Sequence, residues 1–355
     1  MKVGILTFHC AYNYGAMLQC YALQQWLYGQ GADPVVIDYR PHYLETPRPR
    51  IRCSYFKPTT PLRSFKRLFR MYPAMKRQYV AFRDFEDRYL ALSDTFRAKE
   101  DMEQVLSGLD RVVIGSDQIW NTDFNGNDTV WYADFKHASS TRVISYAASA
   151  GDPKTSGCMT LNRFHRVSVR EQALAVMPEV ALSSPVTVCD PVLLASPDVW
   201  KQWESPLVSN PYILVYQGRR DDSLLSLAKE LSARYGAEII SVDCYLNSFS
   251  KGIRHLEPGP DGFVSLVKNA LCVLTTSFHG AAMSIALKTP FYVIRLNDGA
   301  DLRAYELLGR MGLSDRMLGR GEIPDTIDVD FAACMSLLEK ERKISGDYLI
   351  ESLGL

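Results

Sequence analysis

The residues with the clearest chemical potential form a short corner at 277–280, with the sequence Ser-Phe-His-Gly. A β-branched apolar run at 271–276 precedes this corner and predicts a buried strand, and 281–288 predicts a helix. In an open parallel sheet, ligands bind beyond the carboxyl ends of the strands, where a helix N-terminus offers free N–H groups to an anion. The sequence therefore predicts an anion site that also carries a hydroxyl and an imidazole.

Three residues of this corner have predicted roles. Ser277 is expected to bind an anion through its hydroxyl, and Gly280 is expected to let the anion approach the backbone. His279 supplies a proton-transfer group that titrates near neutral pH. An alternative stays open, in which Ser277 only caps the helix and His279 is a hydrogen-bonded surface histidine.

Two further loops follow predicted strands. The strand 2–8 leads into His-Cys-Ala-Tyr-Asn-Tyr-Gly-Ala, and the strand 111–115 leads into Ser-Asp-Gln-Ile-Trp-Asn. Because the carboxyl ends of parallel strands share one edge of a sheet, both loops are expected to border the ligand site, although plain turns would also explain them. The candidate residues in these loops are Asn13, Tyr14, Gly15, Ser116, Asp117, Gln118 and Trp120.

The other elements predict an α/β protein with two open parallel sheets that face a cleft. In the first half, strands are predicted at 2–8, 34–39, 111–115, 142–148, 166–170 and 187–194, with a helix at 17–28. In the second half, strands are predicted at 212–217, 238–242, 271–276 and 291–296, with helices at 223–235, 261–269 and 331–343. Two domains follow, 1–195 and 205–328, with 329–355 forming a helix that packs back on the first.

Composition excludes several classes of protein. Hydrophobic residues make up 47% and charged residues 23% of the 355 residues, and the 40 basic residues balance the 40 acidic ones. No apolar run reaches the roughly 18–20 residues of a membrane span. Eight scattered cysteines without a Cys-x-x-Cys pair indicate reduced thiols and no zinc site. We therefore expect a cytoplasmic enzyme with no metal and no bound cofactor.

An insertion at about 45–90 has a different composition from the rest. Its segment 48–83 holds eleven Lys and Arg, no Asp or Glu, and several aromatic residues. Such a mixture suits peripheral contact with an anionic membrane surface or a polyanionic acceptor. The favoured alternative is a solvated helical insertion whose charges pair with Asp84, Glu86, Asp87 and other acids. Nucleic acid is disfavoured because the chain carries no recognisable nucleic-acid module.

Four motifs in order make the chain resemble the polysaccharide pyruvyl transferase family. They are Asn-Tyr-Gly-Ala-x-Leu-Gln at 13–19, Gly-Ser-Asp-Gln-Ile-Trp-Asn at 115–121, Ser-Val-Arg-Glu at 168–171 and Ser-Phe-His-Gly at 277–280, with Asp-Pro at 190–191. The resemblance implies two Rossmann-like domains arranged as in GT-B glycosyltransferases. It also implies transfer of the enolpyruvyl unit of phosphoenolpyruvate, as a co-substrate, to a sugar of a surface polysaccharide or its undecaprenyl-linked precursor.

The resemblance carries over to individual residues. His279 matches the family's histidine near the start of a helix in the second domain, and Arg170 matches an arginine after a strand in the first. The Gly-Ser-Asp corner matches a loop on the acceptor side. Other members of the family have a sequence similar to Arg-Leu-His where this chain has Ser277-Phe278-His279. The arginine that is expected to bind the donor's phosphate or carboxylate is therefore absent at this position. Arg295 or Arg219 is the predicted substitute.

The implied chemistry needs an acid, a base and cations. Phosphoenolpyruvate carries a phosphate and a carboxylate, which suit arginine forks and helix N-termini. We expect His279 to protonate the donor's methylene carbon and Asp117 to take the proton of the attacking sugar hydroxyl. Alternatively, Asp117 is a turn or helix cap, and Arg170 is a salt-bridge partner of Glu171. Two rival functions are a nucleotide-sugar-dependent glycosyltransferase and a non-catalytic glycan-binding homologue.

Overall fold

The computed structural model describes residues 1–44, 61–157, 160–242, 252–299 and 301–355. Its first sheet has four parallel strands in the order β2-β1-β3-β4. These strands are β1 (Lys2–Leu6), β2 (Asp33–Val36), β3 (Arg111–Gly115) and β4 (Arg142–Tyr146). A two-stranded parallel sheet, β5 (Ser168–Val169) with β6 (Val186–Thr187), continues from β4 through the isolated bridges of Ile144 and Ala148.

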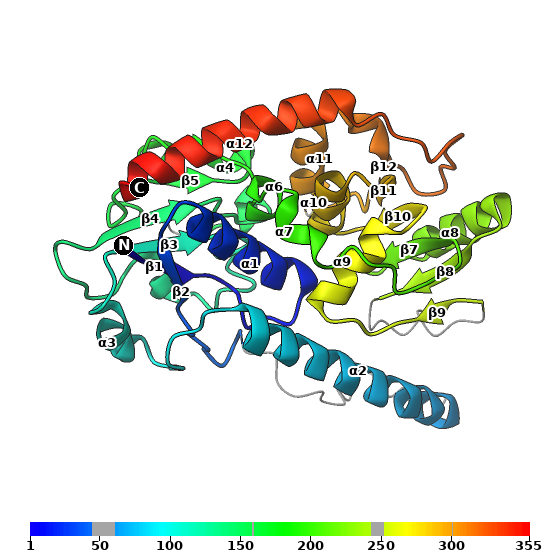
Figure 1. The fold of residues 1–355 in the computed structure, drawn as a ribbon, viewed down its shortest axis with the longest axis horizontal. Helices are drawn as coiled ribbons and strands as arrows, with labels where there is room; N and C mark the ends of the chain where they lie inside the picture. Colours follow the sequence, from blue (N-terminus) through cyan, green and yellow to red (C-terminus); the bar gives the residue numbers. More distant parts are fainter. Residues whose placement is uncertain (45–60, 158–159, 243–251, 300) are drawn as a thin grey trace.

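The second sheet has six parallel strands in the order β12-β11-β10-β7-β8-β9. They are β7 (Tyr212–Tyr216), β8 (Glu238–Ser241), β9 (Arg254–His255), β10 (Cys272–Thr275), β11 (Phe291–Ile294) and β12 (Met317–Leu318). The central strands β7, β10 and β11 are buried along their whole length. Continuous apolar strands of this kind are typical of a parallel sheet that is covered on both faces. The two open parallel α/β sheets predicted from the sequence are confirmed, and they form a GT-B-like architecture (Figure 1).

Helices surround both sheets (Figure 1). In the first half they are α1 (Tyr14–Gly29), α2 (Pro61–Tyr89), α3 (Met102–Leu106), α4 (Gln172–Ala175), α5 (Pro178–Ala181), α6 (Pro191–Leu194) and α7 (Asp198–Lys201). In the second half they are α8 (Asp222–Tyr235), α9 (Pro260–Lys268), α10 (Phe278–Leu287), α11 (Asp301–Arg310) and α12 (Ala332–Leu353). Within the described residues, no helix is both long enough and apolar enough to span a bilayer.

The predicted strand at 187–194 is wrong beyond its first residue. β6 ends at Thr187, and Asp190 caps helix α6 by accepting a hydrogen bond from the Val192 N–H at 3.0 Å. Pro191 stands at the first helical position, where a proline's missing N–H costs nothing. The apolar run alone does not distinguish a buried strand from a short buried helix.

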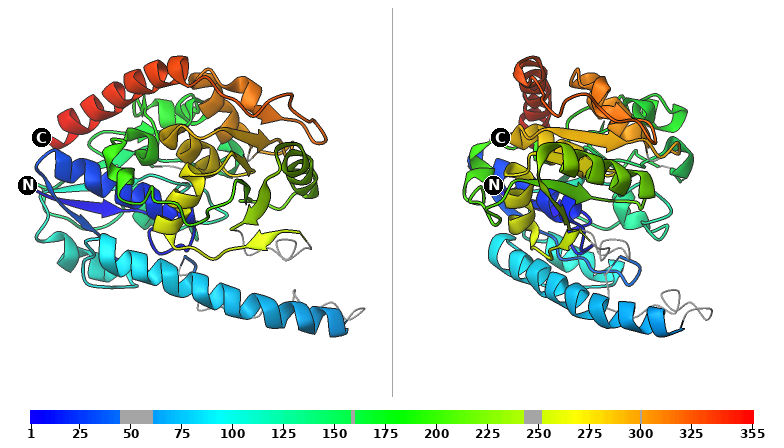
Figure 2. Two further views of the ribbon diagram at one scale, coloured as in Figure 1. Left: turned by 45° about the vertical axis from the view of Figure 1, so that its right-hand side comes forward. Right: turned by 90° about the vertical axis from the view of Figure 1, so that its right-hand side faces the viewer.

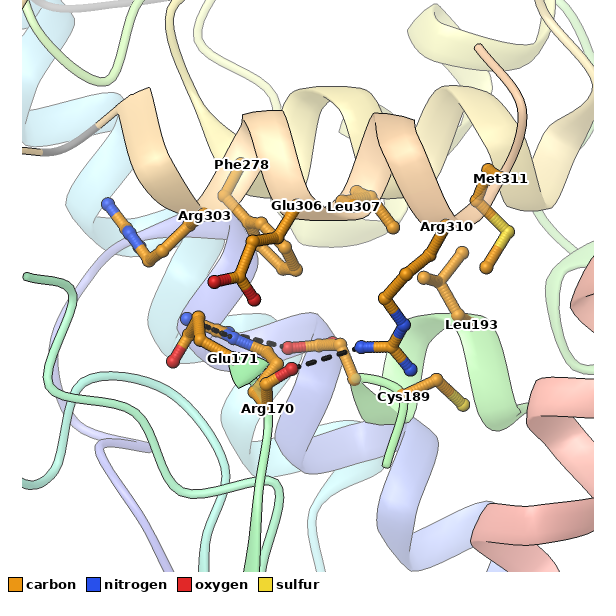
Figure 3. Close-up of a pocket in the computed structure, with 11 residues that line it drawn as sticks. Arg170, Glu171, Cys189, Leu193, Phe278, Arg303, Glu306, Leu307, Arg310 and Met311 are labelled. Atoms are coloured by element: carbon orange, nitrogen blue, oxygen red, sulfur yellow. Dashed lines mark hydrogen bonds and ion pairs between the residues drawn. The ribbon is translucent and has the colours of Figure 1, made fainter. Parts of the chain in front are cut away.

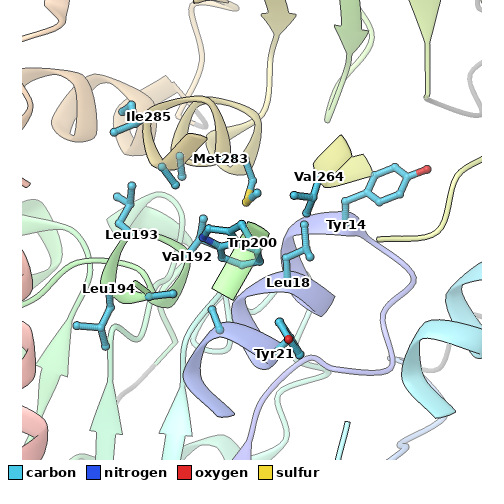
Figure 4. Close-up of a cluster of buried hydrophobic side chains, with 14 of the residues drawn as sticks. Tyr14, Leu18, Tyr21, Val192, Leu193, Leu194, Trp200, Val264, Met283 and Ile285 are labelled. Carbon is cyan, nitrogen blue, oxygen red and sulfur yellow. The ribbon is translucent and has the colours of Figure 1, made fainter. Parts of the chain in front are cut away.

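The two halves share one hydrophobic core (Figure 4). Tyr14 on α1 stacks on Phe263 of α9 with ring centroids 4.4 Å apart. Trp200, which lies between the two predicted domains, is fully buried in the same cluster. Because this contact is apolar and packed, the two sheets are joined by a core and not by a hydrated hinge.

Helix α12 crosses from the second half to the first, and the chain ends close to its start (Figure 1). The Tyr348 hydroxyl donates to the Ser145 carbonyl of β4 at 2.8 Å, and the Arg342 guanidinium donates to the Leu193 carbonyl of α6 at 2.7 Å. Helix α2 runs along one side of the molecule (Figure 2) and contacts α9. Part of the predicted basic insertion, 45–60, lies outside the described residues.

Candidate active site

A cavity of about 460 Å³ opens between the two halves. Five of the predicted site residues line it: Asn13, Asp117, Gln118, Ser277 and His279. Carboxylate, amide and aromatic side chains from the first half make one wall, and hydroxyl, imidazole and guanidinium groups from the second half make the other. The carboxyl ends of β1, β3 and β10 therefore meet at one cavity, as parallel-sheet topology requires.

His279 is enclosed in this wall and is only 5% exposed. Its Nε2 lies 3.4 Å from a carboxylate oxygen of Asp190 and has no hydrogen-bond partner within the described residues. Asp190 belongs to the first half and His279 to the second, so the pair forms only when the halves are docked. The prediction that His279 faces the ligand cavity agrees with its position, and the alternative of an exposed surface histidine does not.

Asp190 is the centre of a buried polar group. It is 1% exposed and accepts hydrogen bonds from the Ser116 hydroxyl at 3.1 Å and from the Arg170 guanidinium at 2.8 Å. Burial alone would raise the pKa of the Asp190 carboxyl, but His279, Arg170 and the Val192 N–H outweigh it and hold this pKa well below its usual range. The site therefore keeps an anion next to the imidazole at neutral pH.

Gly15 has a steric role beside His279. A Cβ atom at this position would lie 2.1 Å from His279 Nδ1, so any larger residue would displace the imidazole. Asn13 caps helix α1, to which Gly15 belongs, because the Asn13 side-chain oxygen accepts a hydrogen bond from the Gly15 N–H at 2.8 Å. The Asn-Tyr-Gly segment thus begins helix α1 and also leaves the space that the His279 imidazole occupies.

Asp117 stands at the carboxyl end of β3 and lines the cavity. Its backbone has a φ of 62°, a conformation that non-glycine residues seldom adopt and that recurs at functional sites. The Ser149 N–H donates to the Asp117 backbone carbonyl at 3.1 Å, which fixes this backbone at the edge of the cavity.

Ser277 and Gly280 differ in their relation to the cavity. Ser277 is the N-cap residue of α10 but makes no side-chain cap hydrogen bond, so its hydroxyl stays available to a ligand. Gly280 does not line the cavity. A Cβ there would lie 2.3 Å from Thr275 Oγ1, so this glycine permits close packing of α10 on the end of β10 and not the approach of an anion.

Arg170 is not where a donor ligand would be. Its guanidinium is 3% exposed, forms ion pairs of 2.8 Å with both Glu171 and Asp190, and lies 4.1 Å from the centre of the Phe278 ring. Arg170 instead lines a void of about 10 Å³ beside α11, and Arg303, Glu306 and Arg310 project toward it from that helix (Figure 3). The predicted alternative of a salt bridge to Glu171 is what the structure shows.

Three other predicted acceptor contacts also lie away from the cavity. Tyr14 is buried against Phe263, and its hydroxyl donates to the Pro258 carbonyl at 3.0 Å. Ser116 is buried and donates to Asp190. Trp120 is fully buried and donates to the Trp131 carbonyl at 3.0 Å. Each follows a strand as predicted, but its side chain points to the protein interior.

The cations of the cavity come from two arginines. Arg219 lines it and pairs with Asp298, whereas Arg295, the other predicted substitute, is exposed and lies outside the lining. Sequence reasoning missed Arg303, which lines the cavity from α11 and forms no ion pair within the described part of the chain. Burial, and then the neighbouring Arg170, lower the pKa of Arg303 to about 10, so it stays a cation at neutral pH. The signal in the sequence that could have pointed to Arg303 is the amphipathic pattern of 301–310, which predicts a helix there.

A metal-capable cluster lies elsewhere. Among the described residues, His9, Asp38 and Glu86 bring one ligand atom each within 4.8 Å of one another. The Arg40 guanidinium already contacts both carboxylates of this cluster, with its Nε 2.6 Å from Asp38. A bound divalent cation would have to displace that arginine, so the residues fit a buried ion-pair network better than a metal.

A cleft between two parallel α/β sheets, lined by an imidazole, carboxylates and guanidinium groups, is typical of enzymes that transfer a group from an anionic donor to a polar acceptor. The model of the family described as polysaccharide pyruvyl transferase matches residues 13–298. The chain belongs to this family, whose name implies a transferase with a saccharide acceptor.

Solved structures with similar shape were also found. UDP-GlcNAc 2-epimerase of Methanocaldococcus jannaschii has 15% identity and a TM-score of 0.49, with 99% of each chain covered. A UDP-N-acetylglucosamine 2-epimerase of Listeria monocytogenes has 12% identity and a TM-score of 0.46, covering 97% of this chain and 90% of that one. UGT89C1 of Arabidopsis thaliana has 12% identity and a TM-score of 0.47, covering 100% and 99%. A comparison with curated proteins gave no match. At these values the similarities carry no argument about the substrate.

Proposed function

We propose that this protein transfers the enolpyruvyl unit of phosphoenolpyruvate to a sugar, forming a pyruvate ketal across two hydroxyls and releasing phosphate. The observation that carries the proposal is the His279–Asp190 pair at the wall of a cavity that also holds Arg219 and Arg303. The Asp190 carboxylate beside Nε2 fixes the orientation of the imidazole, and an imidazole is the side chain that most often serves as a general acid. The family match supports the same reaction class.

The proposed reaction has two stages. In the first, a proton from His279 Nδ1 goes to the methylene carbon of the donor, because Nε2 faces Asp190. A sugar hydroxyl oxygen bonds to the adjacent carbon, and Asp117 takes its proton. In the second stage, the carbon–oxygen bond to phosphate breaks and the oxygen of a second hydroxyl bonds to the same carbon, which closes the ketal ring. The proton of this second hydroxyl returns to His279, and the proton held by Asp117 leaves with the phosphate. One donor and one diol thus yield one ketal and one phosphate.

The proposal includes a cytoplasmic location and an acceptor that is a polysaccharide unit or its lipid-linked precursor. The described cysteines Cys10, Cys20, Cys189, Cys272 and Cys334 are free and buried. Unpaired thiols agree with a reducing compartment. Peripheral contact with the inner face of a membrane is a separate question that the basic insertion raises.

Ligand-dependent melting tests the donor. Millimolar phosphoenolpyruvate at about 100 times its Kd adds roughly 2.7 kcal/mol to the stability of the native state, which shifts Tm by a few degrees in a protein of this size. UDP- and GDP-sugars serve as comparison ligands. Stabilisation by a nucleotide sugar and not by phosphoenolpyruvate would replace the proposal with the glycosyltransferase alternative.

Turnover tests the product. Phosphate release from phosphoenolpyruvate is measured with galactoside and mannosaminyl acceptors, and mass spectrometry of the acceptor detects an added pyruvate ketal. Donor binding without phosphate release from any acceptor in a broad panel would support the non-catalytic alternative.

A further inference from the structure

The proposed function leaves the class of acceptor sugar open, and the first-half wall of the cavity bears on it. We propose that the acceptor ring stacks on Phe124, with Asp123 binding its hydroxyls, and that this wall selects a neutral or amino sugar over an acidic one. This inference rests on the proposed transfer to a saccharide. It concerns a specificity that neither the family nor the reaction determines.

Phe124 is the exposed aromatic side chain of this wall. It lines the cavity and is 53% exposed, whereas the other large aromatics near it, Trp120 and Trp131, are fully buried. Exposing an aromatic ring to water is unfavourable unless a partner covers it. The C–H face of a pyranose ring is apolar and flat enough to cover it by dispersion contacts.

The turn that carries Phe124 is rigidly built. The Phe124 N–H donates to the Asn121 carbonyl at 3.0 Å, and the Asp123 N–H donates to the Asn121 side chain at 2.9 Å. The buried Asn125 side chain donates to the Ile119 carbonyl at 3.1 Å, and the Thr122 N–H donates to the Thr155 carbonyl at 3.0 Å. The backbone that presents the Phe124 ring is therefore preorganised for a ligand.

The charges of the cavity are divided between its walls. Asp117, Asp123 and Asp152 line the first-half wall, and none of them forms an ion pair within the residues that the structure describes. Arg219 and Arg303 line the second-half wall. The dianionic or trianionic donor therefore belongs against the second half, and the acceptor belongs against the carboxylates.

His279 lines the cavity from the second half and is only 5% exposed, so the proton-transfer group lies on the same wall as the two arginines and opposite the carboxylates. Carboxylates accept hydrogen bonds from sugar hydroxyls and attract an ammonium group. They repel the carboxylate of a uronic acid, and such like-charge juxtaposition is a strong means of rejecting wrong ligands.

Saturation-transfer NMR and turnover test the inference with matched methyl glycosides. The probes are neutral hexosides, 2-amino-2-deoxyhexosides and hexuronides in the gluco, galacto and manno configurations. We expect at least one neutral or amino glycoside to bind at millimolar concentration, with its hexuronide counterpart at least about ten-fold weaker. Phe124→Ala should weaken binding of the neutral sugar by about ten-fold. Asp123→Asn should reduce the ratio between the affinities for the neutral sugar and for the hexuronide.

Matched control variants distinguish the effect of the first-half wall on sugar binding from the general effect of removing an exposed aromatic ring or carboxylate. Phe69→Ala removes an exposed aromatic on α2 outside the cavity, and Asp94→Asn removes an exposed carboxylate outside it, so neither should change sugar binding. All variants should keep the Tm shift with phosphoenolpyruvate. Equal binding of hexuronide and hexoside, indifference to Phe124→Ala, or no binding by any probe would overturn the inference. Loss of the phosphoenolpyruvate shift in the wild type would instead overturn the proposed function.

Discussion

The imidazole of His279 sits between two features that the first half supplies. Gly15 leaves room for the ring, and Asp190 faces Nε2 at 3.4 Å. Asp190 is in turn held by Ser116 and Arg170. Arg170 thus acts through another residue: it keeps Asp190 ionised and oriented, and we assign it as a positioning residue.

Substituting His279 tests the acid. His279→Asn preserves a polar side chain of similar size but removes the transferable proton. We expect kcat to fall by about 10²–10⁴, the usual contribution of general acid catalysis, while the affinity for phosphoenolpyruvate falls much less. The measurement is steady-state phosphate release together with donor-induced Tm shifts. Ser277→Ala, at the same corner, should affect donor affinity more than kcat. Near wild-type kcat in His279→Asn would remove the residue from the acid role.

Asp117 extends this test to the base. Asp117→Asn should also lower kcat, and the double variant with His279→Asn should lose less than the product of the single losses if both act on one step. Independent, multiplicative losses would place the two residues in different steps.

Substituting Asp190 tests the positioning of the acid. The Asp190 carboxylate faces His279 Nε2 at 3.4 Å and thereby fixes the orientation of the imidazole. Asp190→Asn should therefore lower kcat for phosphate release, while the affinity for phosphoenolpyruvate, read from the Tm shift, changes much less. Ser116→Ala, which removes a different partner of the same carboxylate, should lower kcat less than Asp190→Asn does. An Asp190→Asn enzyme with wild-type kcat, or one that loses kcat and donor affinity equally, would contradict the positioning role.

At the scale of elements, helix α11 links the second half to the segment after β5. The Glu306 carboxylate accepts from the N–H groups of Gln172 and Ala173 at 2.6 and 2.9 Å, and the Arg310 guanidinium donates to the Arg170 carbonyl at 3.1 Å (Figure 3). The same helix carries Arg303 to the cavity. The placement of this cation therefore depends on an interdomain contact.

A second interelement link ties α2 to the first sheet. Asp38 follows β2 and contacts both His9 and Arg40, and Arg40 reaches Glu86 on α2. Burial would raise the pKa of Asp38, but hydrogen bonds and charge from His9, with Thr95 and Arg40, lower it to about 2. A depressed carboxyl pKa means that the stabilisation is present above the unfolded value of about 3.9 and is lost as pH falls toward 2.

This link predicts a pH-dependent stability difference. At pH 7, Asp38→Asn should lower the free energy of unfolding by about 3–5 kcal/mol, because it leaves buried charges unpaired. The difference from wild type should shrink by about 2 kcal/mol between pH 4 and pH 2. Urea denaturation across this range is the measurement. Asp87→Asn, in an exposed pair with Arg83, should change stability by less than about 1 kcal/mol at any pH. A constant difference would disprove the assigned origin.

At the scale of the whole molecule, the shared apolar core limits how the two halves move. Tyr14, Phe263 and Trp200 pack in a single cluster that extends from α1 to α10 (Figure 4). The His279–Asp190 pair lies beside this cluster and depends on it. We therefore expect substrates to enter a largely preformed cavity.

Helix α2 raises the remaining question of peripheral membrane contact. Some of its basic residues have acidic partners, such as Arg77 with Glu257 and Arg83 with Glu86. These pairs favour the solvated insertion for that part of the helix, whereas Phe69 is 77% exposed. Membrane contact and a solvated insertion predict opposite outcomes with lipid vesicles.

Vesicle sedimentation decides between them. Membrane docking predicts binding to anionic vesicles that weakens steeply with salt, because surface charge is screened. Charge reversal at Arg63, Lys66, Arg67 and Arg70 should then abolish binding while turnover of a water-soluble acceptor stays unchanged. Neutral vesicles are the lipid control, and the side chains of these four residues lie outside the described set. Absent or salt-independent binding leaves the solvated insertion.

The sequence by itself determined the two parallel α/β sheets and the corner at 277–280. Both are local properties: β-branched runs predict buried strands, glycine and proline mark their ends, and parallel topology brings those ends to one edge. Hence Asn13, Asp117, Gln118, Ser277 and His279 could be placed at a common cavity before the structure was known.

Only the tertiary structure decided which way each loop side chain points and which charges are already paired. Tyr14 and Trp120 follow strands but turn into the core, and Arg170 is neutralised by two carboxylates. Arg303 becomes a site residue only because α11 packs against the other half. Side-chain direction and ion pairing depend on contacts between residues far apart in the chain, and no local pattern encodes them.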